Sequence, residues 1–178
     1  MDDERDRVKV RQAVLAVTAL AWAMSWAGTT LLHHAAAGTA VNWLLMLAAM
    51  MAPVLIAPIQ FVRASGLARR RTRSTLLFVA GYTAVWIIAG ALMLTLAAAL
   101  RASTLPPYVQ VVALLVIALV WQCSPAKQAA LNRCHARPAL AAFGRAADTD
   151  VLVFGVTQGV MCAASCWAWM VLPLLVTA

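Results

Sequence analysis

The chain has 178 residues, of which 64% are hydrophobic, and its formal net charge at pH 7 is +8. With a mean hydropathy of +0.85, its long apolar runs exclude an ordinary soluble domain and indicate a membrane protein. The positive charge is not accompanied by a basic face interleaved with aromatic side chains, so we expect no nucleic-acid partner.

Five apolar segments predict transmembrane helices over residues 12–32, 41–61, 75–100, 107–123 and 151–177. The fourth segment reaches the length of a span, about 17–25 residues, if the helix begins at Pro106 or Pro107, because proline suits a first turn. The first segment is too long for the core of a signal peptide, and no clear cleavage site follows it. The predicted fold is an all-α, polytopic membrane helical bundle that forms a single transmembrane domain over residues 1–178.

The basic residues predict the orientation of this bundle. Every Lys and Arg except Arg101 precedes the first segment or lies in one of two connections, between the second and third or between the fourth and fifth segments. The positive-inside rule then places the N-terminus in the cytoplasm and the C-terminus outside. We therefore expect a multi-pass protein of a plasma membrane, in contact with membrane lipid; that this membrane is bacterial is implied only by the family resemblance given below.

The second segment combines a helix break with neighbouring sulfur atoms. Pro53 removes a backbone donor and disturbs the turn that holds Met50, and Met51 lies beside it. Such a break serves either a site at membrane depth or ordinary helix packing.

The connection between the fourth and fifth segments contains Pro125 and Pro138. Residues 126–137 predict a short helix at the cytoplasmic membrane surface, with Lys127 and Arg133 directed at lipid head groups.

The last segment carries Gly155 and Gly159, followed at helical spacing by Cys162 and Cys166. Small residues four apart allow two helix backbones to approach closely. Since steps of three and four keep to one face of a helix, the two cysteines are expected to face a helix partner rather than lipid.

The two cysteines lie one helical turn apart, which suits binding of a single metal ion. At a rise of ~1.5 Å per residue, Cys162 lies about 16 Å into its span and Met50 about 14 Å into the second span from the opposite side. Sulfur ligands select Cu(I), so Cys162 and Cys166 with Met50 or Met51 predict a copper site. The alternative is that Met fills gaps and Cys acts as a small buried hydrophobic residue.

A second group of candidate ligands lies near the cytoplasmic connection. Cys123, Cys134 and His135 have side chains that suit zinc or copper, and they suggest a place where metal enters, although a structural role is the alternative. Tyr82 and Trp86 are interpreted as packing or interface residues without chemistry. The sequence has no catalytic triad, paired carboxylates or phosphate-binding loop, so we do not expect an enzyme.

Taken together, these residues resemble a bacterial family of uncharacterised, predicted metal-binding integral membrane proteins. The resemblance covers nearly the whole chain, and its four motifs occur in order: Met50-Met51-Ala52-Pro53; Tyr82 and Trp86; Gln122, Ser124, Pro125, Lys127, Cys134 and Pro138; and Gly159, Cys162, Cys166, Trp167 and Met170. The resemblance implies a helical membrane protein that binds metal.

The chain departs from the family pattern at two positions. Ser165 replaces the first residue of a Cys-Cys pair, and Ala130 stands where a further loop Cys is common. Family members also often continue into another helix after the last motif. Fewer thiols favour a metal site of low coordination number.

The leading hypothesis is a non-enzymatic membrane protein that binds Cu(I) and delivers it to a copper-dependent membrane enzyme, or helps to assemble one. The first alternative is an accessory subunit of a larger membrane protein complex, with sulfur acting only in packing. The second alternative is a membrane thiol–disulfide oxidoreductase, which the absence of a Cys-x2-Cys motif disfavours.

Overall fold

The computed structural model describes residues 2–31 and 36–176, and all secondary structure in this part of the chain is helical. Seven α-helices and two short 3-10 helices are described, which confirms the all-α prediction. The contacts divide the chain into two compact units, Met1–Arg71 and Thr72–Ala178. Each unit is described by itself, and the expectation of one transmembrane domain stays a prediction.

Two described helices, Ala68–Arg101 and Gly144–Leu175, are long and apolar enough to cross a membrane. Two bent pairs meet the same criterion when each pair is taken as one span, namely Leu44–Met51 with Pro53–Ser65, and Pro107–Gln122 with Pro125–Cys134. Two to four spans are therefore compatible with the described residues, and the five predicted spans stay a prediction. Leu32 and Thr177, which end the first and last predicted spans, lie outside the described residues.

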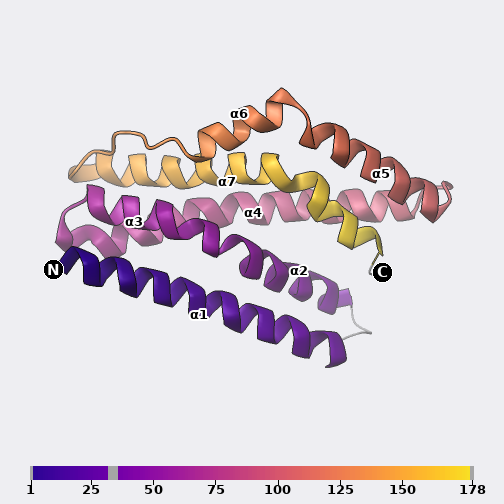
Figure 1. Cartoon of the computed structure of the whole chain (residues 1–178), viewed down its shortest axis with the longest axis horizontal. Helices are drawn as coiled ribbons and strands as arrows, with labels where there is room; N and C mark the ends of the chain where they lie inside the picture. Colours follow the sequence, from indigo (N-terminus) through magenta and orange to yellow (C-terminus); the bar gives the residue numbers. More distant parts are fainter. Residues whose placement is uncertain (1, 32–35, 177–178) are drawn as a thin grey trace. The chain divides into compact units, whose positions relative to one another are not determined.

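The first unit contains α1 (Asp2–Leu31), α2 (Ala36–Met51) and α3 (Ile56–Ser65), joined by the 3-10 helix η1 (Pro53–Leu55). The helices α2 and α3 both pack along α1 (Figure 1). The helix α1 begins well before the predicted span, with acidic residues at positions 2–4.

Pro53 interrupts the second predicted span. The helix α2 ends at Met51, Pro53 begins η1, and the two helical pieces of the pair meet at 41°. Because proline has no backbone N–H, it cannot continue the α-helical hydrogen bonding. The predicted break is confirmed.

The first unit is also held by an ion pair between α1 and α3. Arg63 Nε donates to Asp6 Oδ2 at 2.8 Å, Arg63 Nη2 donates to the other carboxylate oxygen, and Arg71 Nη1 lies 3.6 Å from Asp6 Oδ2. The hydrogen bond from Arg63 holds the pKa of Asp6 below its ordinary value of 3.8, against the opposing effect of burial.

We expect this ion pair to make the stability of the first unit dependent on pH. Because the pKa of Asp6 is lowered in the folded state, its contribution is present above about pH 4 and is lost as the pH falls through the lowered value. The pair is partly exposed, so Asp6→Asn should cost about 0.2–1 kcal/mol at neutral pH and little at pH 3. Unfolding at both pH values checks this, with Glu4→Gln, an exposed acid of the same helix, as the control. An equal cost at both pH values would contradict it.

The second unit contains α4 (Arg71–Arg101, apart from its first residue), α5 (Pro107–Gln122), α6 (Pro125–Cys134) and α7 (Gly144–Val176). The helices α4 and α7 lie side by side and run in the same direction (Figure 1). Arg73 Nη2 donates to Asp148 Oδ2 at 2.8 Å near their starts, and Arg101 Nη1 donates to the Leu174 carbonyl at 3.0 Å near their ends.

Glycines allow the backbones of α4 and α7 to touch. A Cβ added at Gly155 would overlap the Phe78 carbonyl oxygen, and one added at Gly159 would lie 2.9 Å from Val85 Cβ and 3.2 Å from the Tyr82 carbonyl oxygen. On the facing side, a Cβ at Gly81 would lie 2.7 Å from the Leu152 carbonyl oxygen. The close-packing stripe predicted for the last segment is confirmed, and its partner is α4. We call this contact the α4–α7 seam.

The helices α5 and α6 meet at a 64° bend around Cys123 and Ser124. The helix α5 begins at Pro107, as expected, and Ser124 caps α6 by accepting a hydrogen bond from the Lys127 backbone N–H at 3.2 Å. The helix predicted over residues 126–137 is present but ends at Cys134, before Arg137 and Pro138. A residue that precedes proline is disfavoured in a helix, which accounts for the earlier end. The helix α6 packs on α7, and its interfacial position stays a prediction.

Candidate metal centre

The two cysteines of α7 lie at the α4–α7 seam. Cys162 is 7% exposed and Cys166 is half-buried. The Tyr82 hydroxyl of α4 donates a hydrogen bond to Cys162 Sγ at 3.5 Å, while Cys166 Sγ donates to the Cys162 carbonyl oxygen at 3.0 Å. The expectation that Cys162 faces a helix partner is confirmed, because its sulfur contacts a side chain of α4.

Aromatic side chains of α4 form the wall opposite Cys162. The ring centroids of Phe78 and Tyr82 are 6.4 Å apart, as are those of Tyr82 and Trp86, and Phe78 also packs on Phe154 of α7 at 5.4 Å. Phe78 and Trp86 are almost completely buried. The sulfur atom of Cys162 therefore lies in apolar surroundings that exclude water.

One polar atom of this wall has no hydrogen-bond partner within the described residues. The indole nitrogen Nε1 of Trp86 is fully buried and unpaired. An unpaired buried donor costs about 1–3 kcal/mol. The interpretation of Tyr82 and Trp86 as residues without chemistry missed both the Tyr82 contact with sulfur and this donor, since neither is visible until α4 and α7 are paired.

Cys134 approaches the same pair from α6. It is half-buried and lies within electrostatic reach of Cys162 and Cys166. Cys134 comes near the pair because α6 packs on α7.

The other two residues of the predicted cytoplasmic group do not join Cys134. Cys123 is exposed at the start of the bend, and α6 separates it from Cys134 at the other end. His135 is exposed, and its Nδ1 donates to the Leu131 carbonyl oxygen at 2.8 Å. Within the described residues, no group of three His, Cys, Asp or Glu side chains is arranged to hold a metal ion.

The predicted thioether ligands belong to the first unit. Met51 is 9% exposed and Met50 is 50% exposed at the end of α2. Their contribution to a site with Cys162 stays a prediction, since the two units are each described by themselves.

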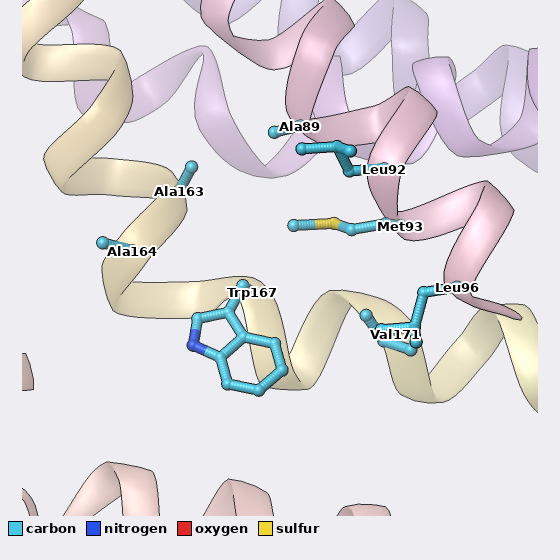
Figure 2. A pocket seen from close by; sticks show the side chains of 8 residues that line it. All are labelled: Ala89, Leu92, Met93, Leu96, Ala163, Ala164, Trp167 and Val171. Carbon is cyan, nitrogen blue, oxygen red and sulfur yellow. The ribbon is translucent and has the colours of Figure 1, made fainter.

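Two further methionines lie close to the seam and were not predicted as site residues. Met170 is buried and follows Cys166 by one helical turn, a spacing that the sequence displays. Met93 of α4 extends its sulfur toward α7 in an open apolar groove of about 300 Å³ (Figure 2). The groove is lined by Ala89, Leu92, Met93, Leu96, Ala163, Ala164, Trp167 and Val171. With a single thioether among these residues, the groove does not form a metal site by itself.

The fold and this centre define a helical protein with reduced thiols buried between packed helices. A family model described as PpoB2, copper chaperone, matches residues 40–178. This match covers well over half of the chain, and the protein belongs to that family. Comparison with curated proteins and with solved structures gives no match.

Membership of a copper chaperone family bears on several expectations. It confirms that the protein is not an enzyme, because a chaperone carries its metal instead of converting a substrate. It supports copper as the metal and a copper-dependent protein as the partner. It assigns no metal ligands, so the candidate residues listed from the sequence stay predictions.

Proposed function

We propose that the protein is an integral membrane copper carrier that binds Cu(I) through Cys162 and Cys166. It delivers this copper to a copper-dependent membrane enzyme or helps to assemble one. The observation that carries the proposal is the thiol pair at the α4–α7 seam in a member of a copper chaperone family.

The chemistry of the pair supports Cu(I). Thiolate sulfur is a soft ligand, and soft ligands favour Cu(I) over hard cations. The buried aromatic wall of α4 keeps water away from Cys162, which favours a site made of few sulfur atoms. We propose Cys134 of α6 as a further thiolate ligand, and Met50 or Met51 as a thioether ligand. Cys123 and His135, which are exposed, are proposed to meet incoming metal.

Placement in a membrane is supported by hydropathy and charge. The long apolar helices α4 and α7 form the seam that holds the thiols. The distribution of Lys and Arg favours a cytoplasmic N-terminus and an external C-terminus. Copper held at the seam would then lie between the two sides of the membrane.

Replacement of both cysteines tests the proposal. Purified wild-type protein should bind Cu(I), and Cys162→Ser/Cys166→Ser should lose most of this binding because a hydroxyl is a poor ligand for a soft ion. Copper content and titration against a Cu(I) chelator provide the measurement. Ser165→Ala, which changes a side chain between the two cysteines without removing a thiol, is the control for a substitution in this turn of α7. Equal copper binding by the double variant and the wild type would refute the proposal.

A further inference from the structure

We propose that Tyr82 is a positioning residue for copper, and that its hydroxyl holds Cys162 Sγ in the orientation in which the sulfur binds Cu(I). This inference rests on the proposed function and deepens it. The juxtaposition that carries it is the hydrogen bond of 3.5 Å from the Tyr82 hydroxyl to Cys162 Sγ, across two different helices.

The position of the Tyr82 hydroxyl is fixed by backbone and ring contacts. Gly159 brings α7 so close that an added Cβ would lie 3.2 Å from the Tyr82 carbonyl oxygen. The Tyr82 ring lies between Phe78 and Trp86, with centroid distances of 6.4 Å on both sides, and the residue is 5% exposed. These contacts hold the Tyr82 ring in the orientation that brings its hydroxyl to the sulfur atom of Cys162.

The side chains of Cys162 and Cys166 make hydrogen bonds to different helices. Cys166 Sγ donates to the Cys162 carbonyl oxygen of its own helix, an arrangement that requires no other element. Cys162 Sγ accepts a hydrogen bond from another helix, α4. Tyr82 thus links the geometry of the thiol pair to the packing of α4 against α7.

A donor beside a ligand sulfur atom affects metal binding in two ways. It fixes the direction of the sulfur lone pairs, and it stabilises the negative charge that remains on a thiolate after it binds a metal. Contacts of this kind to metal ligands change metal affinity about 10–100-fold.

The test compares the two tyrosines of the chain. Tyr82→Phe removes the hydroxyl and keeps the ring, so the variant should fold and melt close to the wild type. Tyr108→Phe removes a hydroxyl at a position that is 71% exposed on α5. Cu(I) affinity is measured by competition with a chelator, and the sulfur-to-Cu(I) ultraviolet band is recorded for each loaded protein.

We expect Tyr82→Phe to weaken Cu(I) binding about 10–100-fold and to shift the ultraviolet band, while the number of copper ions per chain stays the same. Tyr108→Phe should match the wild type in both measurements. Wild-type affinity and an unchanged band in Tyr82→Phe would overturn the inference and leave the proposed function intact. Equal binding by the wild type and by Cys162→Ser/Cys166→Ser would instead refute the proposed function, and the inference with it.

Discussion

Replacement of Gly155 by Ala is expected to destabilise the second unit by about 1–3 kcal/mol, the usual cost of overpacking a well-packed contact. The added Cβ would overlap the Phe78 carbonyl oxygen and lie 3.1 Å from both its carbonyl carbon and its Cα. These are backbone atoms of α4, which cannot rotate away as a side chain can. The helices must therefore move apart, and the hydrogen bond between Tyr82 and Cys162 must lengthen.

Whether Gly155→Ala lowers or raises the stability of the second unit shows whether the backbones of α4 and α7 are in contact. Without a clash, Ala in place of Gly stabilises a helix by about 1 kcal/mol. Gly159→Ala is the graded comparison, because the atoms that its Cβ would meet are farther away: the Val85 Cβ and Cγ1 lie at 2.9 and 3.3 Å, and the Tyr82 carbonyl oxygen at 3.2 Å. We expect a smaller loss there. Thermal unfolding in detergent measures both variants, and a Gly155→Ala variant that melts above the wild type would show that the backbones are not in contact.

Truncation of Trp86 to Ala is expected to have the largest effect on stability, a loss of about 3–5 kcal/mol, as found for large aromatic residues in protein cores. Trp86 is 1% exposed, so its removal leaves a cavity beside Tyr82. Trp86→Phe should cost less, because it leaves a smaller cavity and also removes a buried indole N–H that has no partner among the described residues.

The matched control for Trp86 is Trp169→Ala on α7, where the side chain is 44% exposed. Its removal from the outer face of the helix should cost much less. Unfolding transitions of the four proteins, including the wild type, provide the measurement. Similar losses at Trp86 and Trp169 would contradict the assignment of Trp86 to the core of the second unit.

The parts of this structure that depend on local sequence could be predicted. Gly155, Gly159 and Cys162 lie on one face of α7 because helical spacing alone determines this. The break at Pro53 and the start of α5 at Pro107 follow from the missing N–H and fixed φ of proline. The ends of helices were harder to predict, as at α6, which stops at Cys134 before the Arg137-Pro138 pair.

The helix partner of Cys162 could not be predicted in the same way. Spacing shows that the sulfur faces a neighbour, but the pairing of α4 with α7 depends on contacts between residues about eighty positions apart. The structure places the Tyr82 hydroxyl against this sulfur, and the pairing of Met50 with Cys162 that depth favours stays a prediction. A tyrosine followed by a tryptophan one turn later is common packing, so nothing in the sequence indicated this contact.

If copper binds at Cys162 and Cys166 as proposed, the hydrogen bond from Cys166 Sγ to the Cys162 carbonyl bears on its release. In the metal-free protein this thiol already has an acceptor, and the Cys162 sulfur already has a donor in Tyr82. If a bound ion were lost, both sulfur atoms would therefore still have hydrogen-bond partners. The free-energy cost of an unpaired buried polar group would not arise. Under the proposed function, these contacts stabilise the protein without its ion and so lower the free energy required to give the ion up. A carrier, unlike a storage protein, requires this property.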